Sequence, residues 1–234
     1  MQIAIGDKAF SETVRHDPID ETDGLKMTQK TDFKKTLKHL YAPSAKEWVE
    51  VDVPPLRYLM VDGKGSPGEA AEYFTAVEWL FSLSYSLKFM SKKELGRDYA
   101  VMPLEGLWFA DDFSAYTQSG RRDEWRWTLM ILQPDWITPQ MVETAIDKAL
   151  AKRDDKPASL RLETFHEGRC LTRLHIGPFA DEAPVLHRLH HELMPSLGLT
   201  FNGNHHEIYL SDPRKTAPEK LKTVLRQPVS NASH

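Results

Sequence analysis

Apolar residues recur at two different periods along the chain, and the longer period marks the expected helices. In the longest such stretch, Phe74, Val77, Phe81 and Tyr85 fall three or four residues apart, which places them on one helical face. Another stretch opens with Thr138-Pro139, a favoured N-cap followed by proline at the first helical position. The expected helices span residues 31–41, 67–89, 138–152, 181–197 and 218–225.

Shorter stretches alternate apolar and polar residues, or are rich in β-branched and aromatic residues, and these predict strands. The clearest is Trp48-Val49-Glu50-Val51-Asp52-Val53, which Pro54-Pro55 closes. The turn sequence His166-Glu167-Gly168 lies between two such stretches and predicts a hairpin. The expected strands span residues 48–53, 57–61, 99–109, 125–132, 160–165, 169–175 and 205–210.

The order of these elements is β–α–β–β–α followed by β–β–α–β, so a helix-to-strand pattern occurs twice. It predicts an α+β fold with tandem pseudo-symmetric β-α-β-β repeats, in which helices cover one face of an antiparallel curved sheet. We place repeat one at about residues 48–153 and repeat two at about residues 158–229, within a domain that spans residues 30–229. Residues 1–29 are expected to form a polar leader and residues 230–234 a tail.

Composition narrows the classes of partner. The 234 residues carry a net charge of −4, which provides neither the basic surface that nucleic acid requires nor a polybasic membrane patch. No stretch approaches the roughly 20 apolar residues of a membrane span. The single cysteine, Cys170, excludes an intramolecular disulfide and fits a reducing compartment. We expect a cytoplasmic protein without direct nucleic-acid binding or a membrane partner; the sequence does not define an oligomeric state.

Two motifs resemble known sites but lack residues that the chemistry requires. Residues 63–68 match G-x-G-x-x-G after a strand, yet the acidic residue expected about 20 positions later is absent from Leu83–Phe89. The stretch His191-Glu192-Leu193-Met194-Pro195 begins like a zinc-protease helix, but Pro195 replaces the second histidine. His187 and His191 lie one helical turn apart without an evident third ligand. We expect neither a metal nor a cofactor.

Two glutamates are the strongest candidates for chemistry, because each lies among strand residues and aromatics near the end of a repeat. Strand alternation places Glu105 on a face with Leu107 and Phe109, and Glu207 on a face with His205 and Tyr209. Carboxylates in such surroundings are rarely simple solvated charges. The alternative for each is a structural glutamate paired with a cation. Their matching positions favour one site shared by both repeats.

Several blocks of sequence resemble the stand-alone GyrI-like small-molecule-binding proteins over residues 30–229. The blocks are Pro103-Leu104-Glu105-Gly106-Leu107-Trp108-Phe109, Gln133-Pro134, His175-Ile176-Gly177-Pro178-Phe179, His205-His206-Glu207-Ile208-Tyr209-Leu210-Ser211-Asp212-Pro213-Arg214 and Leu225-Arg226-Gln227-Pro228-Val229. The resemblance implies a small-molecule ligand bound in a groove between the repeats. Its relatives include effector domains of multidrug-sensing regulators, a gyrase inhibitor, and stand-alone proteins that hydrolyse cyclopropane-bearing alkylating compounds.

By this resemblance, Glu105 and Glu207 form the acidic pair of the site and Tyr85 supplies a further catalytic group. The ligand-binding residues expected are Trp108, Phe109, Trp127, His205 and Tyr209. The family pattern carries two tryptophans where this chain has Trp108-Phe109, so one indole donor is lost. With only about 29 residues before the domain, no helix-turn-helix module is expected.

Three functions fit these expectations. In the first, the protein binds an amphipathic aromatic or cationic molecule and hydrolyses a strained ring, with one glutamate as general base and a second glutamate or a tyrosine on the activating carbonyl. In the second, the protein only sequesters the drug. In the third, it inhibits an enzyme such as gyrase by protein–protein contact. The sequence leaves open whether the protein is an enzyme.

Overall fold

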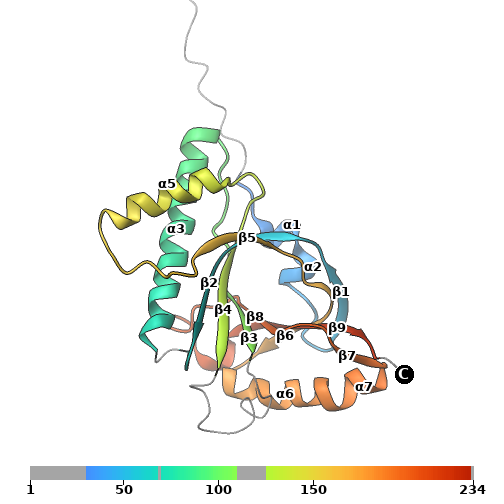
Figure 1. Ribbon diagram of the computed structural model, residues 1–234. Helices are drawn as coiled ribbons and strands as arrows, with labels where there is room; N and C mark the ends of the chain where they lie inside the picture. Colours follow the sequence, from blue (N-terminus) through green and yellow to red (C-terminus); the bar gives the residue numbers. More distant parts are fainter. Residues whose placement is uncertain (1–29, 68–69, 110–124, 233–234) are drawn as a thin grey trace, which may run out of the picture.

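The computed structural model describes residues 30–67, 70–109 and 125–232, which form one strongly curved antiparallel sheet with helices packed on it (Figure 1). Within these ranges nine strands pair in the order β1-β6-β9-β8-β3-β4-β2-β5, and β7 pairs separately with β9. The strands are β1 Val49–Val53, β2 Leu56–Lys64, β3 Glu105–Phe109, β4 Arg126–Gln133, β5 Arg161–Phe165, β6 Gly168–Ile176, β7 Leu199–Phe201, β8 His205–Tyr209 and β9 Lys222–Asn231. The predicted α+β class and curved antiparallel sheet are confirmed.

The strand order shows the two repeats directly. Three strands of repeat one are arranged as β3-β4-β2, and three strands of repeat two as β8-β9-β6, so the halves mirror each other about the β3–β8 pair. The seam between the repeats is therefore a pair of short strands from the middle of the sheet. Side chains from the two repeats can therefore meet where β3 pairs with β8.

The long helices cover the outer face of the curve. In Figure 1, α3 and α5 lie against the half that contains β2 and β4, and α6 and α7 lie against β6 and β9. The short α1 and α2 instead lie on the inner side of the curve. The helices are α1 Phe33–Thr36, α2 Lys38–Tyr41, α3 Ala71–Leu95, α5 Pro139–Leu150, α6 Glu182–Arg188, the π-helical turn η3 Leu189–Leu193 and α7 Met194–Ser196, with 3₁₀ turns η2 Phe179–Asp181 and η4 Pro218–Lys220. No helix of the described residues is long and apolar enough to cross a membrane.

The N-cap and C-cap residues expected from the sequence lie at helix ends in the structure. The Thr138 hydroxyl accepts a hydrogen bond from the Met141 backbone N–H at 3.3 Å, so it caps α5 as predicted. Gly198 follows α7 with φ of 64°, a left-handed conformation that favours glycine. On α3, Trp79, Leu80 and Leu83 are fully buried in the main core, so this face of the helix fixes its orientation on the sheet.

Four sequence expectations are wrong. The strand expected over residues 99–109 forms only as β3, Glu105–Phe109. Residues 218–225 do not form a helix, because only η4 is helical and Lys222–Asn231 forms β9, buried on both faces from Thr223 to Val229. A strand that is buried on both faces loses its alternation, so its pattern resembles that of a buried helix. The predicted hairpin is absent because β5 pairs with β2, whereas β6 pairs with β1 and β9. The expected helix over residues 31–41 divides at Leu37 into α1 and α2.

The predicted domain limits meet the structure only in part. The expected leader, residues 1–29, lies outside the described residues. At the other end, β9 continues to Asn231 and therefore includes two residues of the expected tail.

Candidate functional site

The register of β3 on β8 separates the two predicted glutamates. Glu105 lies opposite Ile208, and Gly106 lies opposite Glu207. Because directly opposed residues of an antiparallel pair share a face and neighbours along a strand alternate, Glu105 and Glu207 point to opposite faces of the sheet. The expectation of one acidic pair formed by these two residues is wrong.

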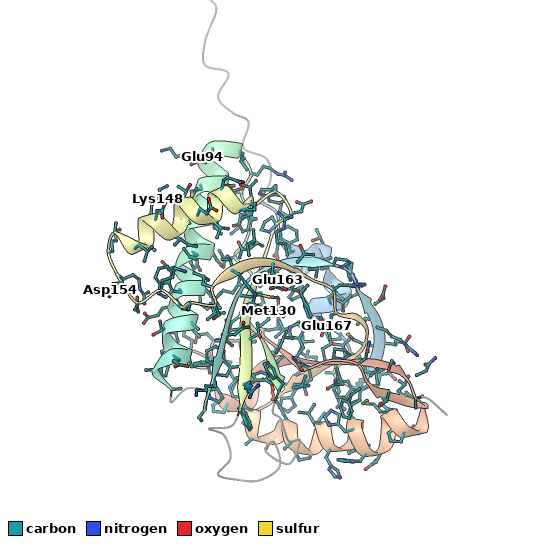
Figure 2. The ribbon with its side chains drawn as sticks, in the orientation of Figure 1. Glu94, Met130, Lys148, Asp154, Glu163 and Glu167 are labelled. Atoms are coloured by element: carbon teal, nitrogen blue, oxygen red, sulfur yellow. The ribbon has the colours of Figure 1, made fainter. Side chains whose placement is uncertain are left out.

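Glu105 belongs to a buried polar network on the inner face. Its Oε1 accepts a hydrogen bond from the Tyr41 hydroxyl at 2.7 Å, and its Oε2 lies 3.0 Å from His206 Nε2. The other ring nitrogen of His206 lies 3.0 Å from Glu167, which also receives a hydrogen bond from Arg226 at 2.9 Å. We call these five residues the inner network; Figure 2 shows Glu167 inside the curve of the sheet.

The inner network is closed to solvent and balanced in charge. The side chains of Glu105 and His206 are 0% exposed, and those of Glu167 and Arg226 are each 1% exposed. Burial opposes ionisation of Glu167, but His206 and Arg226 hold its pKa down at about 2. Burial also opposes protonation of His206, but the two carboxylates raise its pKa above the usual value. Each oxygen of Glu105 already has a hydrogen-bonding partner within the inner network.

A second polar group lies on the outer face, where the repeats meet. The Tyr209 hydroxyl donates to Glu207 Oε2 at 2.7 Å, and the Trp108 indole N–H donates to the Tyr209 oxygen at 3.0 Å. His205 Nε2 lies 3.5 Å from Glu207 Oε1, and the Glu207 side chain is 16% exposed. These four residues come from β3 and β8, so the seam strands position all of them.

Two further residues reach this group from the helices on either side. Tyr73 lies near the start of α3. Burial, followed by the nearby charge of Glu207, raises its pKa to about 12. Glu182 opens α6; burial, followed by the charge of Glu207, raises its pKa to about 9. Glu182 Oε1 has no hydrogen-bond partner among the described residues. We call Tyr73, Trp108, Glu182, His205, Glu207 and Tyr209 the seam cluster.

The seam cluster contains two carboxyls, and the pKa of the more buried one, Glu182, is raised to about 9. Glu182 is protonated at neutral pH, whereas Glu207 carries the charge that helps to keep it so. A buried carboxyl whose pKa is raised above neutrality can act as an acid beside a carboxylate. Burial raises the pKa of Tyr209 well above its usual value, so its hydroxyl stays a donor.

The structure places the sequence-predicted residues in three groups. Trp108, His205, Glu207 and Tyr209 come together in the seam cluster. Trp127 is fully buried behind Tyr73, whose ring meets it edge-on at 5.6 Å. Tyr85 is 49% exposed on α3, about 18 Å along the helix axis from Tyr73 at 1.5 Å per residue.

The remaining predicted residue, Phe109, ends β3 on the face that Glu105 shares. It therefore lies on the other side of the sheet from Trp108. Of the aromatic block Trp108-Phe109, only the tryptophan contributes to the seam cluster.

Two members of the seam cluster escape sequence reasoning. An acidic residue in the first turn of a helix normally complements the helix dipole, so Glu182 carries no signal of a second role. Tyr73 lies in the apolar stripe of α3 and is expected only to pack. The structure places Tyr73 and Glu182 near Glu207, because α3 and α6 each begin close to that residue of β8.

The histidines around η3 do not form a metal centre. The rings of His187 and His191 lie 4.4 Å apart between centroids and are tilted by 44° to each other. Burial, followed by the nearby charges of His205 and His191, lowers the His190 pKa to about 4. Within the described ranges, no group of three or more histidine, cysteine or acidic side chains is arranged to hold a metal ion.

Comparison with known proteins identifies similar chains. A model of the GyrI-like small molecule binding domain matches residues 47–230. An uncharacterized conserved protein from Listeria innocua is 41% identical, with a TM-score of 0.78 over 86% of this chain and 100% of that one. A hydrolase from Listeria innocua is 40% identical, with a TM-score of 0.76 over the same shares of both chains. No curated protein matches the chain.

Proposed function

The chain belongs to the GyrI-like small-molecule-binding domain family, and we propose that it binds an amphipathic aromatic molecule at the seam cluster and hydrolyses it. The observation that carries the proposal is the Glu182–Glu207 pair, which offers a buried acid beside a partly exposed base. The indole of Trp108 and the rings of Tyr73 and Tyr209 supply apolar contacts for a flat ligand. The charge of Glu207 favours a cationic or electron-poor one.

The proposed substrate is an alkylating compound that carries a cyclopropane conjugated to a carbonyl. Glu207 takes a proton from water while the water oxygen bonds to a ring carbon. The carbon–carbon bond of the ring breaks, and its electron pair moves into the carbonyl, whose oxygen takes the proton of Glu182. Transfer of a proton from Glu207 to Glu182 then restores the site, and the product is heavier by one water.

Support for the chemistry comes from the environment and from relatives. A carboxyl whose pKa lies near 9 can donate a proton at neutral pH, which an ordinary glutamate cannot do efficiently. A relative 40% identical over the whole of its own length is described as a hydrolase. The fixed hydrogen bond from Tyr209 aims the Glu207 carboxylate without protonating it.

Sequestration without reaction is the second candidate, and one observation favours it. Both the Tyr209 hydroxyl and His205 lie against Glu207, so a bound cation finds a carboxylate that is already oriented and partly screened from water. In that case the seam cluster is a binding site, and the ligand is recovered unchanged.

A mass-spectrometric time course with a cyclopropane-bearing alkylating compound tests the proposal. We expect wild-type protein to form a product heavier by one water, and Glu207→Gln and Glu182→Gln each to slow turnover by roughly 10²-fold or more. Glu163→Gln is the matched control, because this glutamate of β5 is 49% exposed and pairs with Arg161 away from the seam. Normal turnover in both seam variants would overturn the mechanism, and unchanged compound that co-purifies with the protein would establish sequestration.

A further inference from the structure

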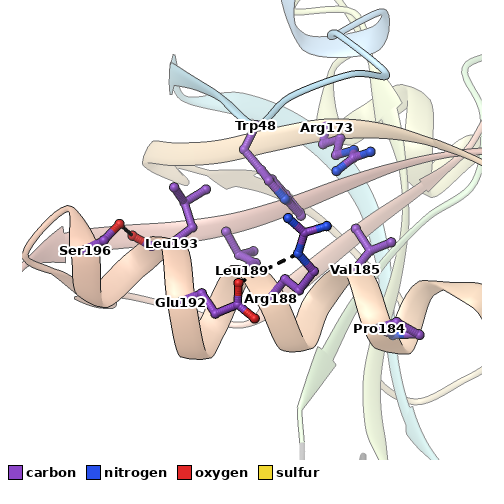
Figure 3. A pocket seen from close by; sticks show the side chains of 9 residues that line it. All are labelled: Trp48, Arg173, Pro184, Val185, Arg188, Leu189, Glu192, Leu193 and Ser196. Atoms are coloured by element: carbon purple, nitrogen blue, oxygen red, sulfur yellow. Dashed lines mark hydrogen bonds and ion pairs between the residues drawn. The ribbon is translucent and has the colours of Figure 1, made fainter.

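A groove of about 500 Å³ lies beside the helical segment that begins with α6 (Figure 3). Its walls are the helical segment from α6 to α7 on one side, and Arg173 of β6 with Trp48, which directly precedes β1, on the other. In the sheet, β6 is two positions from β8, the strand that carries Glu207. We call it the helix groove; its main lining residues are Trp48, Arg173, Val185, Arg188, Leu189 and Leu193.

The helical wall of the groove has an apolar floor and a charged rim. Val185, Leu189 and Leu193 recur every four residues and line the floor, while Arg188 and Glu192 follow the rim with the same spacing. The π-helical turn η3 spans Leu189–Leu193. Such turns interrupt regular α-helix and are frequent at functional sites. A volume of about 500 Å³ falls within the range of small-molecule pockets.

The strand wall adds an aromatic ring beside a cation. Val49 of β1 pairs with Thr172 of β6, so the preceding Trp48 lies alongside Arg173. Arg173 donates one hydrogen bond to the Ala45 carbonyl at 3.1 Å. Figure 3 shows the Arg188 guanidinium directed from the helix across the groove toward the Trp48 ring. An indole and two guanidiniums thus surround the apolar floor.

The charges of the groove favour an anion. Arg173 and Arg188 face a single acidic lining residue, Glu192. The Arg188–Glu192 ion pair is loose, at 3.8 Å, with side chains 75% and 66% exposed. An exposed pair of this kind contributes little and can exchange for a ligand. The seam cluster has the opposite preference, because the carboxylate of Glu207 is its partly exposed charged group.

We propose that the helix groove is a second ligand site, which takes a small amphipathic carboxylate with a flat apolar body. The body lies along Val185, Leu189 and Leu193 under the Trp48 ring. The carboxylate lies between the guanidiniums of Arg173 and Arg188, whose planar forks match carboxylate geometry. This site is independent of the function proposed for the seam cluster.

Isothermal titration with 2-naphthoate, and with 2-naphthylmethylammonium as a cation of matched shape, tests the proposal. Wild-type protein binds the naphthoate more tightly than the cation at this groove. The double variant Arg173→Gln/Arg188→Gln weakens naphthoate binding by roughly tenfold or more, because two charged hydrogen bonds are lost. Glu192→Gln tightens it by about twofold to fivefold, since it frees Arg188 from its ion pair.

Two controls keep the test decisive. Arg188→Gln alone leaves the Arg173–Ala45 hydrogen bond intact and still weakens naphthoate binding, so a folding defect in the double variant cannot carry the result. Glu207→Gln leaves naphthoate binding unchanged, because it alters only the seam cluster. Equal binding of both probes to Glu207→Gln, in which the cation site of the seam cluster is lost, would overturn the proposal, as would absence of naphthoate binding or affinity that survives the loss of both arginines. Sensitivity to Glu207→Gln would overturn it also.

Discussion

At the scale of single residues, three glutamates that look alike in the sequence differ in burial and in hydrogen bonding. Glu105 is buried between Tyr41 and His206 and is fully hydrogen-bonded. Glu207 is partly exposed beside Tyr209 and His205. Glu182 is buried and protonated. Strand alternation predicts which residues share a face within β3 and within β8, but the register between these strands, which places Glu105 and Glu207 on opposite faces, cannot be predicted from it. Sequence spacing also cannot show that Glu207 affects Glu182, since these residues come from different elements.

The raised pKa of Glu182 predicts that the protein loses stability as pH rises. An unfolded glutamate ionises near pH 4.5 and the folded one near pH 9, so between these values the folded state holds one extra proton. Wild-type stability therefore falls by up to about 1.4 kcal/mol per pH unit relative to Glu182→Gln, which does not titrate. Urea unfolding at pH 5, 6.5 and 8 measures the difference.

The matched control for this prediction is Glu192→Gln. Glu192 lies on the same helical segment with its side chain 66% exposed, so its replacement leaves the pH slope unchanged. A constant difference between wild type and Glu182→Gln across the three pH values would show that Glu182 is ionised in the folded state.

At the scale of elements, a shift of one residue decides which face of the sheet a side chain meets. Glu105 and Glu207 both lie near the start of their strands, β3 and β8. The residue of β8 that shares a face with Glu105 is nevertheless His206, one position before Glu207. Similar placement within a repeat therefore does not ensure a shared site, because strand side chains have a period of two. Most strands are predicted from pattern. The exceptions are β7, which the pattern does not predict, β9, which is buried on both faces, and β3, which is shorter than the expected strand over residues 99–109.

The inner network joins elements of both repeats, so we expect His206 to support stability rather than chemistry. His206→Gln leaves Glu105 and Glu167 buried together without the imidazolium between them. Breaking a buried ion pair costs about 3–5 kcal/mol, which lowers Tm by about 10 °C in a chain of this size. Thermal unfolding by circular dichroism measures it.

The sign of the pH dependence gives a second readout for His206. Its folded pKa lies above the unfolded value of about 6.5, so its contribution is complete below that pH and is lost as pH rises through the folded pKa. The difference between wild type and His206→Gln is therefore larger at pH 5.5 than at pH 9, while Glu167 stays ionised throughout. His205→Gln, on the outer face of the same strand, is the control and changes stability by less than about 1 kcal/mol. Equal effects of the two variants would contradict the inner network.

At the scale of the whole molecule, the pseudo-symmetric sheet creates two environments back to back. The inner face of the seam holds a closed, charge-balanced network, and the outer face holds an acidic cluster between the ends of α3 and α6. The α+β class and the repeats follow from the periodicity and order of the elements. The curvature that buries Glu167, and the connection from β5 to β6, depend on pairings between strands far apart in the sequence and lie beyond pattern reasoning.

The most direct test of this account compares the affinity of a permanent aryl ammonium cation for wild type, Glu207→Gln and Glu105→Gln by isothermal titration. Thermal unfolding of each variant confirms that it is folded. The account predicts that Glu207→Gln weakens binding by roughly tenfold or more, because the only exposed carboxylate of the seam cluster is lost, and that folded Glu105→Gln binds within about twofold of wild type. Loss of affinity in Glu105→Gln with normal binding in Glu207→Gln would place the ligand on the inner face and contradict the account.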